Sequence, residues 1–121
     1  MQTTKSKIFA ERAGRLSETV AVIFLRLKGY RILKRRYKTH VGEIDIIASR
    51  WKTLVILEIK YRKTRSDAAE SVTFKQRQRI ERATTQFLQE GHRYTQIRFD
   101  VILISLYKGL HHIQDAWRSD Q

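Results

Sequence analysis

Residues 43–62 read EIDIIASRWKTLVILEIKYR. Apolar and polar residues alternate within 43–49 and again within 53–62, with a short loop between them. This alternation predicts two half-buried antiparallel strands joined as a hairpin. Because side chains alternate between the two faces of a strand, one face of this hairpin is wholly apolar and must be buried. Its members are Ile44, Ile46, Ala48, Val55, Leu57 and Ile59.

The other face of the hairpin carries charged residues. With the loop centred after Trp51, the register places Asp45 opposite Glu58. It also places Glu43 opposite Lys60. Directly opposed Cβ atoms lie about 4.5–5.5 Å apart, so the two carboxylates of the first pair repel each other and destabilise the sheet.

A divalent cation between Asp45 and Glu58 would offset this repulsion. Carboxylates, a backbone carbonyl and water are the oxygen ligands that Mg²⁺ or Mn²⁺ prefers. Lys60 projects from the same face as Glu58, where its ammonium could hold an attacking water or stabilise charge developing on phosphorus. The arrangement favours a metal-dependent phosphodiester-cleaving site. The simpler alternative is a cross-strand ion pair between Glu43 and Lys60, with Asp45 solvated.

The rest of the chain supplies the other elements of the fold. A helix is predicted over 6–28, from apolar residues at three- and four-residue steps: Phe9, Ala13, Leu16, Val20, Ile23 and Leu27. A second helix begins at a capping box, Thr73 to Gln76, and runs to about residue 90. Further segments are a strand over 30–37, a loop over 64–71, a strand over 95–106 and a last short strand over 111–117. The order α-β-β-β-α-β, with a closing strand, predicts an α/β fold in which helices flank a mixed sheet.

Composition narrows the class of protein. The 121 residues include no cysteine, which excludes a disulfide scaffold, a thiolate nucleophile and a cysteine-based zinc site. The longest apolar run covers only residues 20–25, whereas a membrane span needs about 20 residues. No secretory signal is recognisable over 1–10. We therefore expect a soluble cytoplasmic protein that does not bind membranes.

The charge is strongly basic and unevenly distributed. Lys and Arg number 25 against 12 Asp and Glu, a net charge of +13, and residues 1–40 carry 11 of the basic residues with two acids. Clustered positive charge of this size indicates a polyanionic partner. We expect a nucleic acid, DNA rather than RNA, with Lys34, Arg35, Arg36 and Lys38 along the phosphate track.

Two segments carry a family resemblance. Residues 42–48 (Gly-Glu-Ile-Asp-Ile-Ile-Ala) and 54–62 resemble the YraN-like family of uncharacterised bacterial proteins. Members of that family are similar to PD-(D/E)xK nucleases of the restriction-endonuclease-like fold and, more distantly, to archaeal Holliday junction resolvases. The similarity covers residues 11–117 and implies a single restriction-endonuclease-like domain over 1–121, with 1–7 as a flexible tail.

The resemblance also implies roles for individual residues. Asp45 and Glu58 would bind Mg²⁺ or Mn²⁺, Lys60 would be catalytic, and Glu18 would lie at an acidic position near the metal. Further nucleic-acid contacts would come from Arg62, Lys75, Gln76 and Arg79. The chain departs from the family pattern at Ser17, where glycine is common before the acid, and at Gln76, where a basic residue is usual.

The function expected from these residues is a Mg²⁺-dependent endonuclease that acts on structured or branched DNA. The alternative is a nucleic-acid-binding module that retains the nuclease fold without turnover. The sequence leaves the oligomeric state open, with a homodimer as one alternative.

Two residues outside the hairpin strands also carry expectations. Asp100 lies in an apolar strand and is expected to pair with a core arginine, Arg98 or Arg79, rather than to be catalytic. Trp51 at the hairpin tip either packs on a neighbour, which we favour, or offers a platform on which a base could stack.

Overall fold

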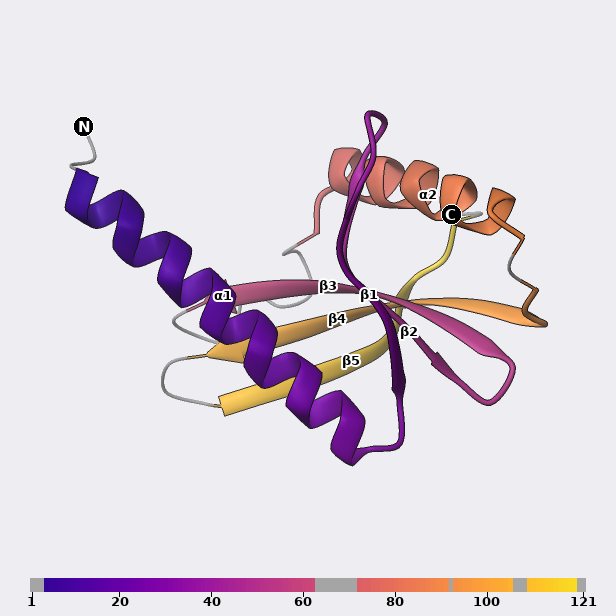
Figure 1. Cartoon of the computed structure of the whole chain (residues 1–121), viewed down its shortest axis with the longest axis horizontal. Helices are drawn as coiled ribbons and strands as arrows, with labels where there is room; N and C mark the ends of the chain where they lie inside the picture. Colours follow the sequence, from indigo (N-terminus) through magenta and orange to yellow (C-terminus); the bar gives the residue numbers. More distant parts are fainter. Residues whose placement is uncertain (1–3, 63–71, 92, 106–108, 120–121) are drawn as a thin grey trace.

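The computed structural model describes residues 4–62, 72–91, 93–105 and 109–119, with side chains from residue 14 onward. Its elements follow the order α-β-β-β-α-β-β and confirm the predicted mixed α/β architecture (Figure 1). They are α1 (Thr4–Leu27), β1 (Arg31–Lys38), β2 (Glu43–Arg50), β3 (Thr53–Arg62), α2 (Phe74–Gln89), β4 (Gln96–Ser105) and β5 (Gly109–Trp117). The expected loop over 64–71 lies outside the described residues. Of the expected tail, residues 4–7 belong to α1 and residues 1–3 lie outside the described part.

The five strands form one sheet in the order β1-β2-β3-β4-β5. Strands β1, β2 and β3 are antiparallel neighbours, β3 and β4 are parallel, and β5 returns antiparallel to β4. The parallel pair requires a crossover, and the described part of that connection is α2. The predicted hairpin register is confirmed over the pairs from Ile46–Leu57 to Arg50–Thr53.

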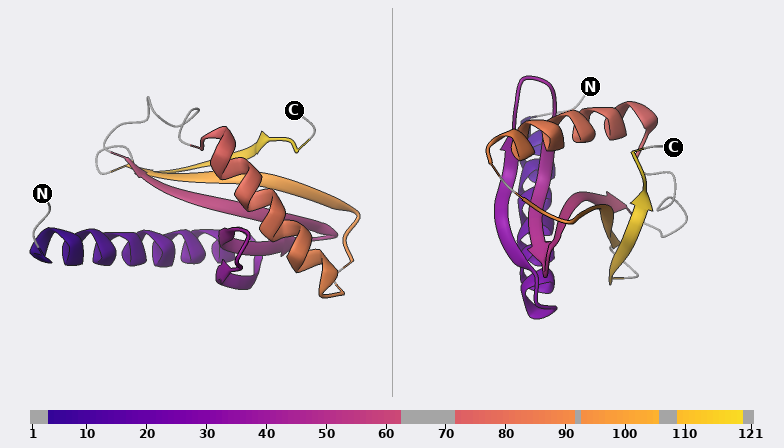
Figure 2. Two further views of the ribbon diagram at one scale, coloured as in Figure 1. Left: turned by 90° about the horizontal axis from the view of Figure 1, so that it is seen from above. Right: turned by 90° about the vertical axis from the view of Figure 1, so that its right-hand side faces the viewer.

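The sheet is covered on both faces, as the two side views in Figure 2 show. On one face, α1 packs through Ala21, Val22 and Leu25 against a cluster that includes Val55 and Leu57. On the other face, α2 packs through Ile80, Ala83 and Phe87 against Ile47, Leu54 and Ile56. The prediction of half-buried strands is therefore wrong for β2 and β3, because the crossover places a second helix on the face that we expected to be polar.

One residue of the predicted apolar face also changes sides. Ile44 packs in the α2 cluster, whereas Ile46 packs in the α1 cluster, so strict alternation fails between them. The adjoining strand is irregular at the same level. Arg36, with φ of 51°, lies between the pairs Arg35–Ile46 and Tyr37–Ile44. This left-handed residue locally twists the edge of the sheet.

Helix α1 meets the sheet through a face that the sequence did not identify. Its predicted apolar stripe is solvent-exposed, at 65% for Leu16, 41% for Val20, 53% for Ile23 and 83% for Leu27. The buried face consists instead of Ser17, Glu18, Ala21, Val22 and Leu25. The side chains of Phe9 and Ala13 lie outside the described ones. Within the described ranges, neither helix is long and apolar enough to cross a membrane.

The turn between β1 and β2 is fixed against α2. The Thr39 hydroxyl donates to the Gly42 carbonyl (2.7 Å) and accepts the backbone N–H of Gly42 (3.0 Å), which closes the turn. A Cβ atom at Gly42 would overlap the backbone carbonyl of Arg79. Only glycine allows this close approach of hairpin and helix. At the start of α2, the predicted capping box of Thr73 and Gln76 is confirmed.

Candidate active site

The ladder between β2 and β3 ends at the pair Ile46–Leu57. Beyond it, β2 continues to pair with β1, and β3 continues with β4 as far as Arg62–Ser105. The predicted opposition of Asp45 and Glu58 is thus not part of a regular ladder. Instead, Asp45 Oδ2 accepts the backbone N–H of Ile59 at 2.8 Å, so a carboxylate takes the place of a strand carbonyl. The two strands part at this point, next to a cleft of about 380 Å³ that Asp45 lines.

The carboxyl group of Glu58 lies beside Asp45 and is largely shielded from water. Burial, followed by repulsion from Asp45 and a hydrogen bond with it, raises the pKa of Glu58 to about 9, while Lys60 acts in the opposite direction and Glu43 adds a smaller rise. Neutral pH therefore favours the protonated form of Glu58. The shift indicates a site that lacks positive charge.

Among the described residues, Lys60 is the cation that forms an ion pair with Glu58. Its Nζ lies 4.0 Å from Glu58 Oε1, and only 12% of its side chain is exposed. The alternative of a Glu43–Lys60 cross-strand ion pair is wrong, because β2 follows β1 away from β3 before Glu43 is reached. Lys60 is instead a half-buried cation whose ammonium lies near Glu58 of its own strand.

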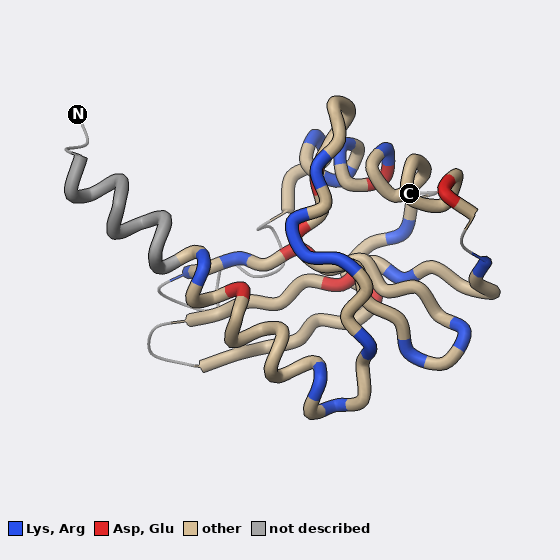
Figure 3. Tube along the Cα trace, in the orientation of Figure 1, with Lys and Arg blue, Asp and Glu red and all other residues tan. Residues whose placement is uncertain are grey.

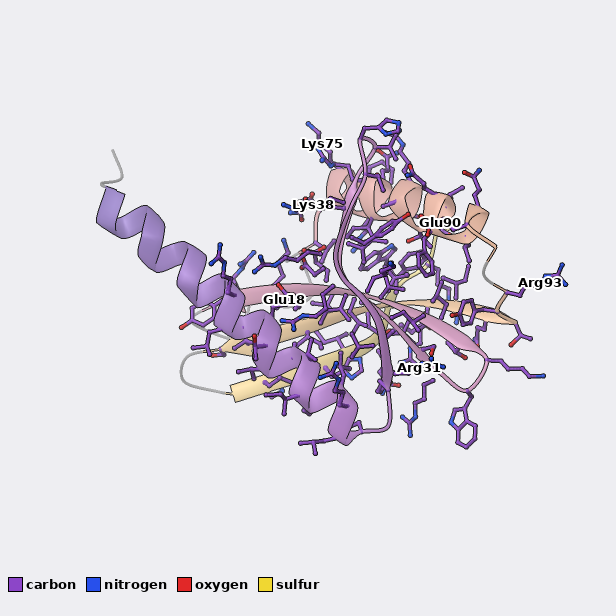
Figure 4. All side chains as sticks on the ribbon, in the orientation of Figure 1. Glu18, Arg31, Lys38, Lys75, Glu90 and Arg93 are labelled. Atoms are coloured by element: carbon purple, nitrogen blue, oxygen red, sulfur yellow. The ribbon has the colours of Figure 1, made fainter. Side chains whose placement is uncertain are left out.

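Glu18 reaches the same cleft from α1, and Figure 4 shows it on the side of the helix that faces the strands. Arg35 Nε donates to Glu18 Oε1 at 2.9 Å, and Arg36 Nε donates to Oε2 at 2.6 Å. The position near the predicted metal is therefore occupied by a carboxylate whose two oxygens are already held by guanidinium groups.

The predicted nucleic-acid residues fall into groups. Lys34, Arg35, Arg36 and Lys38 are exposed along β1, and Figure 3 shows this basic track beside the acidic positions. Arg36 and Lys38 line the Asp45 cleft. Lys75 and Arg79 on α2 line a second cleft of about 420 Å³, which contains Glu58. The two clefts share Glu43, so basic side chains flank the carboxylates from both β1 and α2.

Besides Arg35 and Arg36, which pair with Glu18, two more predicted contact residues are engaged within the chain. The Gln76 side chain accepts the backbone N–H of Thr73 at 3.0 Å, which commits it to the helix cap. Arg62 donates to the Tyr61 carbonyl at 2.8 Å, at the end of β3. Gln76 nevertheless lines the cleft that contains Glu58.

Other residues that line the clefts were not among the predicted site residues. Arg15 lies one helical turn before Glu18 and lines the Asp45 cleft with it, a proximity that three-residue spacing on a helix could have indicated. Glu43 lines both clefts and lies two residues before Asp45. His40 and Arg82 line a third cleft of about 390 Å³ together with Lys75 and Arg79, where the hairpin turn approaches α2.

The structure brings together the two carboxylates that we predicted to bind metal, but among the described residues it shows no complete set of protein ligands. Among the residues that the structure describes, no three His, Asp or Glu side chains are grouped so that they could hold an ion. An ion at Asp45 and Glu58 would need a backbone carbonyl and water as further ligands. This partial ligand set suits Mg²⁺, which retains several of its water molecules in protein sites.

Two expectations outside the clefts are resolved. Asp100 pairs with Arg98 as predicted, through contacts of 2.9 and 2.8 Å, and also contacts His112. Trp51 at the tip of the β2–β3 hairpin is 91% exposed, so the favoured interpretation that it packs on a neighbour is wrong.

The family relationship is supported over most of the chain. The model of the uncharacterised protein family UPF0102 matches residues 17–104, a span that contains Glu18, Asp45, Glu58 and Lys60. The chain belongs to the UPF0102 family. A UPF0102 protein of Parvibaculum lavamentivorans is 42% identical over 111 residues, covering 90% of this chain and 84% of the relative. One from Paramagnetospirillum magneticum is 41% identical over 117 residues, covering 92% and 91%. One from Caulobacter vibrioides is 40% identical over 110 residues, covering 89% and 88%.

Membership thus confirms the expected uncharacterised bacterial family. The family description and the names of these relatives state no activity.

Proposed function

We propose that this protein is a metal-dependent phosphodiesterase that cleaves structured DNA. The observation that carries the proposal is the parting of β2 and β3, which leaves Asp45 and Glu58 adjacent, each lining a cleft with basic side chains, and Lys60 beside Glu58. Carboxylates that bind a cation, a nearby ammonium and a path for phosphates are the components that metal-assisted phosphodiester hydrolysis requires.

The chemistry of the donors fits a hard divalent cation. Asp45 and Glu58 offer carboxylate oxygens in a partly buried position, and their mutual repulsion is offset only weakly by Lys60 at 4.0 Å. A cation held there would remove the need for a shared proton. When bound, Mg²⁺ or Mn²⁺ would polarise a phosphate oxygen and supply a more acidic water at neutral pH.

The side chains of the chain itself would position the substrate. The Lys60 ammonium is close enough to Glu58 to orient a water molecule or to stabilise charge developing on the phosphate. Arg36 and Lys38 on one side, and Lys75 and Arg79 on the other, would bind phosphates that flank the scissile bond. These contacts neutralise phosphates without reading base sequence.

A non-catalytic DNA-binding module is the second candidate. The specific observation in its favour is Glu18, which is bound to Arg35 and Arg36 rather than directed at the carboxylate pair. In that case the acidic residues of the cleft would serve to hold the arginines in place, and binding would need no metal.

Side-by-side assays of metal binding and cleavage distinguish the two candidates. Labelled junctions, flaps, duplexes and single strands are incubated with Mg²⁺, Mn²⁺ or a chelator, and Mn²⁺ binding is measured by calorimetry. The wild type should bind Mn²⁺ and cleave at least one structure, and Asp45→Ala should abolish both. Asp115→Ala is the matched control, since its carboxylate is exposed and pairs with Arg118 on the surface. Tight metal-independent binding with no cleavage would favour the binding module, and equal cleavage by Asp45→Ala would reveal a contaminant.

The basic track is tested through the salt dependence of DNA affinity. Each neutralised phosphate contributes about 0.9 log units of affinity per log unit of salt. Replacing Arg35 and Arg36 with alanine should reduce this slope by about one to two contacts. Arg93→Ala is the control, because Arg93 lies far from β1 (Figure 4). Affinity that does not change with salt would contradict the phosphate-track interpretation.

A further inference from the structure

The third cleft, where the turn between β1 and β2 approaches α2, differs in charge from the other two. We call it the basic cleft, and its lining residues are His40, Val41, Lys75, Gln78, Arg79 and Arg82. Three of these described residues are Lys or Arg, one is His and none carries a carboxylate. In the clefts that contain Asp45 and Glu58, by contrast, the lining cations and carboxylates are equal in number. The unbalanced charge of the basic cleft therefore fits an anionic ligand.

The three cations of the basic cleft form one stripe of α2. Lys75, Arg79 and Arg82 are four and three residues apart, so they lie on the same side of the helix, within about 10 Å along its axis. Like charges at these spacings destabilise a helix. The acid next to them in sequence, Glu81, lines a different groove together with Thr84 and Thr85. The fold thus maintains a repulsion between cations that a bound anion would relieve.

The backbone fixes the distance between the two walls of the basic cleft. His40 belongs to a turn in which the Thr39 hydroxyl accepts the backbone N–H of Val41 at 3.2 Å. Gly42, in the same turn, packs against the backbone carbonyl of Arg79 so closely that a Cβ atom would not fit. Lys75 lies beside this turn (Figure 4). A site whose walls are already in position has less conformational entropy to lose on binding.

We propose that the basic cleft binds the terminal phosphate of a DNA strand. A phosphodiester carries one negative charge, whereas a terminal phosphate carries close to two at neutral pH and offers three acceptor oxygens. The guanidinium groups of Arg79 and Arg82 and the ammonium of Lys75 supply charge and N–H donors that match such a group. The inference rests on the proposed function in taking DNA as the molecule that carries the phosphate.

The basic cleft adjoins the candidate active site through shared residues. Lys75 and Arg79 line both the basic cleft and the cleft that contains Glu58. A terminal phosphate bound there brings the end of a strand next to the pair formed by Asp45 and Glu58. The preferred substrates are therefore nicks, flaps and single strands with phosphorylated ends. A closed junction, which has no strand end at its centre, binds less tightly.

Fluorescence anisotropy with internally labelled single strands, in a chelator so that no strand is cleaved, tests the proposal. One strand carries a 5′-phosphate and one a 3′-phosphate. A third strand has hydroxyl ends and is two nucleotides longer, so that its total charge matches that of the others. The wild type should bind one of the phosphorylated strands about 10-fold more tightly than the hydroxyl-ended strand. At constant ionic strength, inorganic phosphate should compete with the phosphorylated strand only.

Substitutions at Arg82 assign the preference to the basic cleft. Arg82 lines this cleft and is not among the residues that line the clefts of Asp45 and Glu58. Arg82→Gln should remove most of the preference, and Arg82→Lys should retain part of it because the charge remains. Arg82 is exposed, so circular dichroism of both variants should match the wild type. Arg93→Gln is the matched control, since it removes one exposed cation outside the basic cleft, and it should retain the full preference.

The outcomes separate this inference from the proposed function. A wild type without a preference for phosphorylated ends would overturn the inference, as would a preference that survives Arg82→Gln. Equal competition by inorganic phosphate against all three strands would also overturn it, because charge alone would then explain binding. Cleavage without end preference would contradict this inference alone. End preference that depends on Arg82, in a protein that never cleaves, would support the inference and contradict the nuclease activity.

Discussion

Two carboxylate sites in the same sheet, one buried and one half-buried, are built in opposite ways. Asp100 on β4 is fully buried and receives Arg98, His112 and the backbone N–H of Asp115 at 2.7–2.9 Å. Burial alone would raise the pKa of Asp100, but these hydrogen bonds lower it below the ordinary value. On β2 and β3, Asp45 and Glu58 face each other, and the cation beside them is 4.0 Å away.

The difference separates structural from functional use of buried charge. A buried carboxylate with complete partners contributes to the folded state, and its loss leaves the partners unsatisfied. A partly buried carboxylate pair with only a distant cation beside it lowers stability and persists only where another requirement maintains it. The predictions below test this contrast.

The largest effect is expected at Asp100. Asp100→Asn removes the negative charge that holds Arg98 and His112, and should lower the free energy of unfolding by about 3 kcal/mol or more. Urea denaturation at pH 7 measures the loss. In the wild type, the contribution of Asp100 is present above the unfolded pKa and is lost as pH falls through the lower folded value. Asp115→Asn, at a surface carboxylate, should change stability by less than about 1 kcal/mol, and an equal loss in both variants would contradict the contrast.

Loss of Arg98 is expected to lower stability, whereas loss of Lys60 is expected to lower the rate of cleavage. If the protein cleaves DNA, Lys60→Ala should reduce the rate about 100-fold, the effect of removing one preorganised charge at a transition state. Lys60→Arg should not restore the rate, because a planar guanidinium does not fit where a compact ammonium lay. Single-turnover cleavage measures both variants against Lys52→Ala, an exposed lysine at the hairpin tip. Full activity of Lys60→Ala would remove Lys60 from the proposed mechanism.

Glu58 should show the opposite stability effect to Asp100. Its pKa of about 9 in the folded state exceeds that of the unfolded chain, so the folded state holds the extra proton and stability falls as pH rises between these values. Glu58→Gln removes this loss of stability at high pH, because glutamine does not ionise. In metal-free buffer the variant should gain roughly 2 kcal/mol at pH 8 and nothing at pH 4.5, by urea denaturation at both pH values. A variant that is less stable than the wild type at pH 8 would show that the pair is not repulsive.

The smallest effect is expected at Asp45. Asp45→Asn removes one charge of the repelling pair, while its amide oxygen can still accept the Ile59 N–H, so the metal-free protein should gain about 1 kcal/mol. Millimolar Mg²⁺ or Mn²⁺ should raise the melting temperature of the wild type by mass action and should leave this variant unchanged. A destabilised variant, together with a wild type that does not respond to metal, would contradict the metal site.

The order of elements and the register of the hairpin could be read from the sequence, because alternation and loop length determine which residues face each other. The side that α1 presents to the sheet could not. Its two apolar faces have similar spacing, and the choice depends on which one fits the sheet, where Ala21 allows close approach. The burial of both faces of β2 and β3 was missed for a related reason: alternation does not reveal the helix that the parallel crossover places on the second face.

The candidate site was predicted in part. Asp45, Glu58 and Lys60 lie close in sequence to one turn, so strand geometry brings them near one another. The pairing of Glu18 with Arg35 and Arg36 joins residues 17 and 18 positions apart across a helix and a strand. No local pattern encodes that distance. It follows from the left-handed Arg36, whose conformation is unusual for a residue other than glycine.

The contact between Gly42 and the main chain of α2 has a consequence for how two basic surfaces are spaced. Because the hairpin turn rests on the backbone at Arg79 rather than on a side chain, the separation between β1 and α2 cannot be adjusted by a change of rotamer. Lys38 on β1 and Lys75 on α2 (Figure 4) are therefore held at a constant separation. A duplex, a single strand and a branch point differ in width between phosphates, so if the protein binds DNA as proposed, a constant separation would favour the form whose width matches it.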